Sequence, residues 1–370
     1  MKHLILSIAL FSISFSCQSG IEISVENTSD YDRTSIVEIP VERLMKVSSG
    51  KTYVVTNAKK EQIPSQVTYD GKLIFQTSIK VHEKLAFFIG TGAHKKFPPL
   101  TYGRYIKERK DDFAWENDRV AFRIYGPALI ATDGPSNGID VWYKRTNALI
   151  IDKWYKDDIA KKQSYHEDHG EGLDDYKVGR TLGAGAMAPF INDSLLILNE
   201  NYVSQELLEN GPIRTTFRLT YKDLDINGKN VSEKRTFSLD AGSQLTKVTQ
   251  EYGTSDTLIV AAGIVKREGK DEIYESKSDY GTSAIIYVEP ENSKVGNVFI
   301  GLVFPEGLEE CKSINSHVIG ITKYYPSKPV TYYTGYGWEK FGFPSITDFQ
   351  NYIELFTIEL EQPLKISFVK

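Results

Sequence analysis

The chain has 370 residues, with 44 lysine and arginine side chains against 49 aspartate and glutamate side chains, so its formal net charge is −5 at pH 7. This negative charge argues against broad nucleic-acid binding, which needs a positive field along the phosphate backbone. It does not exclude a small anionic substrate, because basic side chains gathered at one site are sufficient to bind it.

Residues 1–16 are typical of a signal peptide. Lys2 supplies a positive charge, residues 4–15 are apolar, and Ser16 and Cys17 follow. The apolar run is too short to anchor the chain across a bilayer. The serine and cysteine at its end resemble a bacterial lipoprotein box. We therefore expect cleavage before Cys17, a lipid on Cys17 that anchors the protein to a membrane, and a location in the periplasm or at the cell surface. An ordinary secretory peptide is the alternative.

Beyond residue 20, alternation with a period of two dominates and predicts an all-β fold. The alternating runs are rich in β-branched and aromatic residues. The expected strands are 21–25, 35–39, 52–56, 72–75, 85–89, 120–125, 139–143, 213–221, 231–239, 245–252, 284–288, 298–304, 317–324 and 352–359. Only residues 150–162 and 345–351 show a helical pattern, which argues against a parallel α/β fold.

So many antiparallel strands in one chain indicate stacked sheets with one buried face each. The turn-rich segment 90–100 marks a border. We expect residues 21–95 to form an N-terminal β subdomain packed on a main sandwich made by residues 96–370.

Residues 163–187 form the stretch that we interpret as the active-site loop. Five glycines oppose a regular helix or strand there. A long glycine-rich loop dense in titratable groups is costly to order, and compact domains keep such loops for binding or catalysis. Its chemically active residues include Tyr165, His166, Glu167, Asp168, His169, Glu171, Asp174, Asp175 and Tyr176.

Four further segments carry arginine, lysine or aromatic side chains suited to a sugar acid. Arginine pairs with a carboxylate through two parallel hydrogen bonds, and exposed tryptophan or tyrosine stacks on a sugar ring. The candidates are Arg109 in 108–115 (with Arg123 and Tyr125 after it), Lys144 in 142–145, Arg214 in 210–218, and Tyr336 and Trp338 in 334–344, which we expect to be a loop. The alternative is that Arg214 and Arg218 only balance acidic groups on a sheet surface.

The pair His166 and His169 also suggests a metal site, since two histidines can converge on zinc. The spacing is one residue short of the HExxH motif, and the glycines oppose the helix that this motif needs. We therefore expect no cofactor and no metal, with a divalent cation at the two histidines as the minor alternative. Neither a GxSxG serine turn nor a strand–loop–helix nucleotide motif is present.

Four blocks of this sequence resemble a family of Bacteroidota proteins known as domain of unknown function 4861. The blocks are ERKDDFAWENDRVAFRIYGPAL, GIDVWYKR, YHEDHGEGLDDYKVGRTLGAG and NGPIRTTFRLTY. The resemblance extends from about residue 22 to the end. It implies a β-supersandwich related to galactose mutarotase and polysaccharide lyases, and a secreted protein of polysaccharide utilisation. It also implies dehydration of a terminal uronic acid on an oligosaccharide, as in ulvan breakdown.

Elimination of water from a uronate, which gives a 4,5-unsaturated sugar, needs three groups. A base takes the C5 proton, an acid protonates the oxygen leaving C4, and cations neutralise the carboxylate. From chemistry alone we assign His166 or His169 as the base and Tyr165 or Tyr176 as the acid. Arg214, with Arg109 or Lys144, is expected to bind the carboxylate, and Tyr336 and Trp338 the sugar.

Three other functions fit the same residues. A polysaccharide lyase uses the same elimination but expels a sugar instead of water. A hydrolase would use a carboxylate pair such as Glu167 with Asp174. A non-catalytic lipoprotein would bind the acidic oligosaccharide through the aromatic and basic groups alone.

Overall fold

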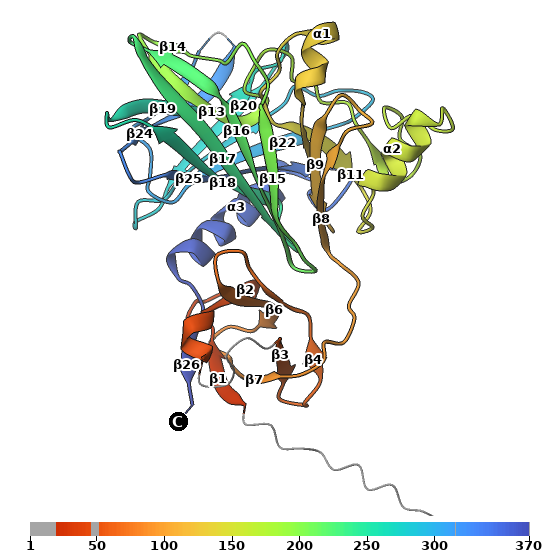
Figure 1. The fold of residues 1–370 in the computed structure, drawn as a ribbon, viewed down its shortest axis with the longest axis vertical. Helices are drawn as coiled ribbons and strands as arrows, with labels where there is room; N and C mark the ends of the chain where they lie inside the picture. The colour runs from red at the N-terminus through yellow and green to blue at the C-terminus, as the bar shows by residue number, and fades with distance from the viewer. Residues whose placement is uncertain (1–19, 46–51, 315, 370) are drawn as a thin grey trace, which may run out of the picture.

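The computed structural model describes residues 20–45, 52–314 and 316–369. The predicted signal peptide and Cys17 lie outside the described residues. The all-β prediction is confirmed, because antiparallel sheets dominate the described chain. Figure 1 shows two lobes joined by the chain that leads into β8 and by the helix α3. In the described ranges, no helix has the length and apolarity to cross a membrane.

The smaller lobe, called the N-lobe here, consists of two facing sheets in the part of the chain that is described. Its apolar core contains Ile23, Val37, Phe75 and Ile89. The first sheet has the order β26 (Lys365–Phe368), β1 (Ile21–Glu26), β7 (Lys84–Thr91), β3 (Tyr53–Asn57) and β4 (Gln62–Ile63), and the second has the order β2 (Arg33–Pro40), β6 (Lys72–Ile79) and β5 (Ser65–Val67), with the 3₁₀ turn η1 (Val41–Leu44) after β2.

The last strand corrects the expected domain boundaries. β26 pairs with β1, so that Ile366 lies opposite Val25, and Ile366 and Phe368 pack on the N-lobe core. The N-lobe therefore combines the beginning of the described chain with its end, and residues 96–370 do not all belong to the larger lobe. The expected border near residue 95 lies in the connection between β7 and β8.

The larger lobe, called the main lobe, is a sandwich whose first layer is one long antiparallel sheet. In the described residues this sheet has the order β15 (Ser204–Asn210), β16 (Arg214–Ile226), β17 (Lys229–Asp240), β18 (Leu245–Gly253), β25 (Val330–Trp338), β22 (Val298–Phe304), β21 (Ser283–Val288) and β20 (Glu272–Lys277).

The second layer is made of two sheets, which an isolated parallel bridge between Ile139 and Gly183 links. The main core, with Trp115, Phe122, Ile264 and Leu302, lies between the two layers. This is the supersandwich architecture expected. In the described chain one sheet contains β12 (Gly172–Leu173), β11 (Asp140–Lys144), β10 (Ala121–Ile124), β9 (Asp112–Asn117) and β8 (Thr101–Ile106), and the other contains β14 (Ser194–Leu195), β13 (Ala184–Ile191), β19 (Leu258–Val265), β24 (His317–Tyr324) and β23 (Glu310–Ser313).

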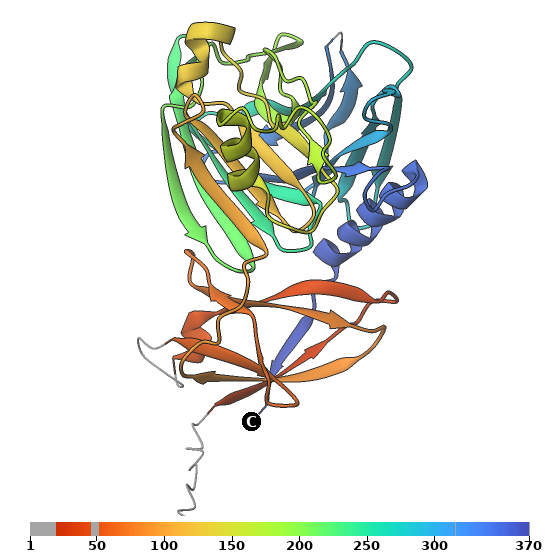
Figure 2. The same cartoon turned by 90° about the vertical axis from the view of Figure 1, so that its right-hand side faces the viewer.

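One short helix covers the outside of the second layer, and another helical segment lies beyond the ends of the strands (Figure 1). The turn η2 (Pro127–Leu129) runs into α1 (Ile130–Asp133), and α2 (Ile151–Ile159) follows β11. The helix α2 confirms the helical pattern seen in residues 150–162. In Figure 2, α2 lies in front of the strands of the second layer.

The prediction of a strand over residues 352–359 is wrong, because this segment belongs to α3 (Ile346–Glu361). Ser345 and Asp348 form a capping box at its start, which satisfies backbone N–H groups that the first turn leaves free. Phe349 and Ile353, one turn apart, are buried on the outer face of the long sheet. A period of 3.6 was therefore present, and the β-branched residues concealed it.

The segment 334–344 is likewise not a loop throughout, since Tyr336 and Trp338 lie on the central strand β25. Its glycines permit close packing there. A Cβ atom on Gly335 would stand 1.9 Å from the carbonyl oxygen of Gln244, and one on Gly337 would stand 2.5 Å from the ring of Phe349. At these two positions, neighbouring residues therefore approach the strand more closely than they could if the glycines carried a side chain.

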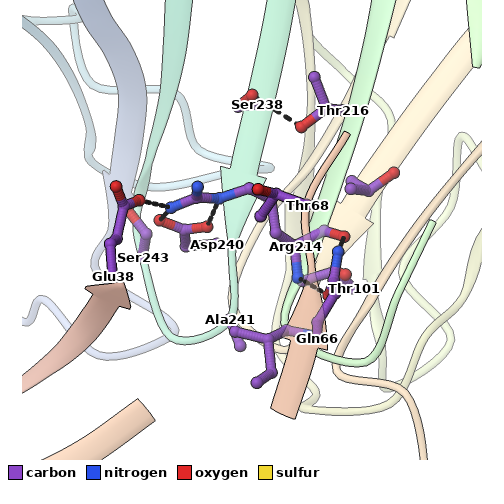
Figure 3. A network of polar contacts seen from close by, with 12 residues as sticks. Glu38, Gln66, Thr68, Thr101, Arg214, Thr216, Ser238, Asp240, Ala241 and Ser243 are labelled. Atoms are coloured by element: carbon purple, nitrogen blue, oxygen red, sulfur yellow. Dashed lines mark hydrogen bonds and ion pairs between the residues drawn. The ribbon is translucent and has the colours of Figure 1, made fainter. Parts of the chain in front are cut away.

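Arg214 connects the two lobes instead of facing a substrate. Its guanidinium pairs with Asp240 of β17 at 2.8 Å and with Glu38 of the N-lobe at 2.8 Å (Figure 3). Gln66 of the N-lobe accepts a hydrogen bond from the Arg214 backbone N–H. Burial disfavours the charge, but Asp240 and Glu38 hold the pKa of Arg214 above its usual value. The assignment of Arg214 to substrate binding is therefore wrong.

His317 generates a prediction about stability and pH. Its side chain is buried, and its Nε2 accepts a hydrogen bond from the Leu182 N–H at 3.0 Å. Burial lowers the pKa of His317 to about 4, whereas an unfolded histidine titrates near ~6.5. As the pH falls from 6.5 towards 4, the unfolded state takes up a proton first, so the folded state loses on the order of 3 kcal/mol.

Urea unfolding of the wild type and of His317→Gln at pH 7.5 and pH 4 measures this loss. The difference in unfolding free energy between the two proteins should shrink by about 3 kcal/mol at the lower pH. A difference that does not change with pH would show that the ring is not held neutral.

Candidate active site

The candidate site lies on the outer face of the sheet β8–β12, beneath α2 and the loop 160–183. Side chains alternate along β11, so Asp140, Trp142 and Lys144 face this outer layer while Tyr143 faces the main core. The Trp142 ring stacks between Trp154 of α2 and Tyr165 of the loop, with centroid distances of 5.4 and 5.1 Å. These aromatic contacts attach α2 and the loop to the outer face of the sheet.

The loop keeps the irregular course expected from its glycines, apart from the short strand β12 and the start of β13. Gly172 shows why glycine is needed. Its φ is +115°, and a Cβ atom there would stand 1.8 Å from the Tyr143 carbonyl oxygen. The loop can therefore pair with β11 at this point, which brings Tyr165, His166 and Asp174 together over the sheet.

At the centre of the site lies a group of residues that we call the Arg123 cluster: Arg123, Tyr125, Asp112, Asp140 and Asp174. The Arg123 side chain is 2% exposed and contacts Asp140 and Asp174, the latter at 2.7 Å. Its Nη2 also donates to the Tyr125 hydroxyl, which in turn donates to Asp140 Oδ2 at 3.1 Å. Burial disfavours the charge of Arg123, but Asp174 and Asp140 raise its pKa well above the usual value.

Several buried polar atoms of this region have no hydrogen-bond partner within the described chain. Buried polar atoms in folded proteins are nearly always satisfied by protein, solvent or ligand, so these atoms make the region a candidate for binding solvent or a ligand. The atoms are Arg109 Nη1, Arg123 Nη1, Asp112 Oδ2, Asp140 Oδ1 and the Tyr155 hydroxyl oxygen.

Two carboxyl groups and the phenol of the Arg123 cluster have pKa values above their usual range. Burial raises the pKa of Asp140 to about 7, against the opposing effect of Arg123. Burial also raises the pKa of Asp112. Burial and the neighbouring Asp140 raise the pKa of the Tyr125 phenol. A region with three carboxyl groups around one buried guanidinium can therefore hold a proton near neutral pH.

His166 lies at the edge of the cluster with a defined orientation. Its side chain is 57% exposed, and its Nδ1 lies 3.0 Å from the backbone oxygen of Asp174 and 3.6 Å from Asp174 Oδ2. A carbonyl oxygen only accepts hydrogen bonds, so Nδ1 carries the proton in the neutral ring. The lone pair then lies on Nε2, which is free to accept a proton.

Arg109 and Tyr165 lie beside this imidazole. Arg109 Nε donates to the Tyr165 hydroxyl oxygen at 3.3 Å, and the rings of Tyr165 and His166 are 4.6 Å apart between centroids. Within the described residues, no carbonyl or carboxylate accepts the Tyr165 hydroxyl proton. Three residues proposed from the sequence are thus brought together, although they come from two segments more than 50 positions apart.

His169 faces a different surface. Its Nε2 lies 3.2 Å from the Ser164 carbonyl oxygen and 3.8 Å from Glu167. It borders a shallow hollow in which acidic groups outnumber basic ones: Lys153, Trp154, Asp157, Gln163, Ser164, Tyr165, Glu167, His169, Glu171 and Gly172. His166 and His169 lie against different backbone oxygens, those of Asp174 and Ser164, and no group of three or more metal-binding side chains occurs in the described part of the chain.

Four other predicted site residues have structural roles. Lys144 is fully buried and pairs with Glu116 at 2.9 Å. Tyr336 is 2% exposed and donates its hydroxyl proton to the Trp142 carbonyl oxygen, and Trp338 is 1% exposed and donates to the Val295 oxygen. Tyr176 is 4% exposed beneath the guanidinium of Arg267. The assignment of Lys144, Tyr336 and Trp338 to substrate binding and of Tyr176 to acid catalysis is wrong, because neighbouring chain covers these side chains.

Sequence reasoning overlooked Asp112, Asp140 and Tyr155 and gave Arg123 no role. Asp112 and Asp140 each begin a strand on which every residue is buried. A charged residue at a core-facing position of such a run is the signal that could have found them. Tyr155 lies on the amphipathic helix α2, where it was indistinguishable from an ordinary core residue.

Comparison with known sequences gives one extensive family match. The sequence model of the family described as domain of unknown function (DUF4861) matches residues 25–366. The uncharacterized protein P7 of Formosa agariphila is 31% identical over 322 residues, which are 80% of this chain and 77% of that protein.

Comparison with solved structures gives weaker similarities. A protein of glycosyl hydrolase family 38 from Enterococcus faecalis has 9% identity and a TM-score of 0.48, with 96% of this chain and 48% of that chain covered. An alpha-mannosidase from Enterococcus faecalis has 10% identity and a TM-score of 0.46, with 96% and 46% covered. The chain spans about half the length of each.

The buried pair Lys144–Glu116 generates a stability prediction. Glu116 also accepts hydrogen bonds from the N–H groups of Ile150 and Ile151 at the start of α2. Lys144→Met leaves a buried carboxylate without its cation and should cost about 3–5 kcal/mol in urea unfolding. Adding Glu116→Gln should recover part of this loss.

The matched control is Lys153→Met, which removes an exposed pair with Glu171 and should cost at most about 1 kcal/mol. Equal losses in Lys144→Met and Lys153→Met would contradict the assigned role of Lys144.

Asp140 generates a spectroscopic prediction. Because burial raises its pKa to about 7, its carboxyl group should be largely protonated at pH 6 and ionised at pH 8. The infrared difference spectrum between these two pH values should contain the carbonyl stretch of a carboxylic acid, and Asp140→Asn should lack it. The same band in the variant would place the proton on another residue.

Proposed function

The chain belongs to the DUF4861 family, and on this premise we propose that it removes water by β-elimination from a terminal uronic acid of an acidic oligosaccharide. The product is a 4,5-unsaturated uronate. The enzyme is then a carbon–oxygen lyase of polysaccharide degradation. The observation that carries the proposal is the meeting of a free imidazole nitrogen, a guanidinium and a phenol at His166, Arg109 and Tyr165.

His166 is the proposed base. Its Nε2 takes the proton from C5, and the electrons of that C–H bond form the C4–C5 double bond. The resulting imidazolium keeps its hydrogen bond to the Asp174 backbone and gains the attraction of the Asp174 carboxylate at 3.6 Å. Arg123 fixes that carboxylate in turn. A positioned base of this kind contributes roughly 10²–10⁴ in rate.

Tyr165 is the proposed acid. It is 4% exposed, like Tyr176, but it borders a surface hollow and contacts His166, whereas Tyr176 lies beneath Arg267. Its hydroxyl proton moves to the oxygen that leaves C4, so the C4–O bond breaks with release of water. Hydroxide is a poor leaving group, and the reaction therefore depends on this proton. The Arg109 guanidinium beside the hydroxyl oxygen stabilises the phenolate that remains, because an opposite charge nearby favours the ionised form.

Arg109 also supplies the proposed binding group for the uronate carboxylate. Its Nη1 is buried and has no partner within the described residues, but the residue as a whole is partly exposed, and this exposed part is the proposed contact for a carboxylate beside Tyr165. Removal of the C5 proton adds negative charge next to the carboxylate, and a fixed cation there stabilises the transition state.

The surroundings favour His166 over His169 as the base. The hollow beside His169, which Tyr165 also borders, is lined by Asp157, Glu167 and Glu171, and these carboxylates repel an anionic group from the His169 side. The imidazole of His166 instead lies next to the ring of Tyr165, whose hydroxyl contacts Arg109. We further propose that the protein acts in the periplasm or at the cell surface, anchored through a lipid on Cys17.

The test is incubation of the purified protein with oligosaccharides that end in a saturated uronate, followed by mass spectrometry. We expect loss of one water per chain, new ultraviolet absorbance and no new reducing ends. New reducing ends in proportion to the absorbance would show a polysaccharide lyase instead. Binding without product would show a carbohydrate-binding protein.

Substitutions test the assigned roles. His166→Ala and Tyr165→Phe should each lower kcat by about 10²–10⁴ without unfolding the protein. His169→Ala and the N-lobe variant His82→Ala, whose ring pairs with Asp30 on the surface, should retain near wild-type rates. A wild-type rate in His166→Ala, or a loss in His169→Ala of the same size, would refute the choice of base.

A further inference from the structure

The connection between β21 and β22, residues 289–297, is a rigid turn that reaches the site from the opposite layer of the sandwich. The Asn292 side chain accepts hydrogen bonds from the N–H groups of Lys294 at 2.9 Å and Val295 at 3.3 Å. Trp338 Nε1 donates to the Val295 oxygen at 2.9 Å. The turn is therefore fixed internally and also fixed to the central strand β25.

Lys294 extends from this turn to the two chain segments that hold the imidazole of His166. Its Nζ donates to the His166 backbone oxygen at 3.0 Å and to Asp175 Oδ1 at 2.6 Å. Asp175 directly follows Asp174, whose backbone oxygen receives the Nδ1 proton of His166. The lysine thus contacts His166 itself and the residue next to Asp174, the two segments that the Nδ1 hydrogen bond connects.

We propose that Lys294 is a positioning residue for the elimination and fixes the orientation of His166 through the backbone. The proposal rests on the proposed function, because it assumes that the orientation of this imidazole limits the rate. Without the ammonium, residues 166 and 175 lose their shared partner. The two segments then keep the hydrogen bond from the Asp174 N–H to the Tyr165 oxygen at 2.8 Å and the ion pair of Asp174 with Arg123, so the hydrogen bond from Nδ1 to Asp174 loses one of its restraints. A displacement of about 1 Å in a catalytic group can cost on the order of 10²-fold in rate.

Two other roles for Lys294 give different results. A merely structural surface ion pair contributes little to stability and nothing to turnover; the exposed fractions of Lys294 and Asp175 are 51% and 22%. A direct contact with the uronate carboxylate would lower affinity on removal, and would therefore raise KM. A positioning role lowers kcat and leaves KM almost unchanged.

The kinetic experiment compares Lys294→Met and Lys294→Arg with the wild type on the uronate-ended oligosaccharide. We expect kcat of Lys294→Met to fall about tenfold or more, with KM and the melting temperature close to those of the wild type. Arginine retains the charge and the donors, so Lys294→Arg should recover most of the rate. The matched control is Lys328→Met, which removes an exposed pair with Glu306 at 2.6 Å and should leave kcat unchanged.

A second readout needs no substrate and separates this proposal from the proposed function. In protein labelled with ¹⁵N-histidine, the His166 ring should show a single Nδ1–H tautomer in the wild type and a mixture of tautomers in Lys294→Met. An unchanged tautomer in the variant overturns the proposal even if the wild type proves inactive on every uronate. An unchanged kcat, or a loss confined to KM, overturns it if the wild type is active.

Discussion

The buried guanidinium of Arg123 is the interaction on which the site depends. It is 2% exposed and contacts carboxylates from β11 and from the loop, with Tyr125 beside them. A charge at this depth is stable only with such partners. The same contacts fix Asp174 against the sheet, and Asp174 orients His166. The energetic need to pair one buried cation therefore places a surface imidazole in a defined position.

Much of the fold could be predicted because its signal is local. Alternation of apolar and polar residues identified most strands and the all-β class. The segment 352–359 misled because Ile353, Phe356 and Ile358 are β-branched or aromatic, while its helical start depends on a capping box at Ser345. The glycines of 334–344 misled because they permit close packing inside a sheet as readily as they form a loop.

The candidate site could be predicted only in part, because pairing in space is not local. The loop residues Tyr165 and His166 were proposed from their density of titratable groups, and Arg109 from its neighbours, and the structure places the three side by side. Nothing in the sequence reveals that Arg214 pairs with Glu38 of the other lobe, or that Lys144 finds Glu116 in the interior. The charges of these two basic residues, which were predicted to bind substrate, are thus paired with carboxylates from distant parts of the sequence.

The pairing of β26 with β1 also constrains the order of assembly. The first sheet of the N-lobe cannot be completed until residues 365–368 have been synthesised. Until then the edge of β1 is open to pairing with other chains. The N-lobe, whose other strands precede the main lobe in the chain, is consequently among the last parts to close, and a chaperone that shields an exposed strand edge would act on this segment.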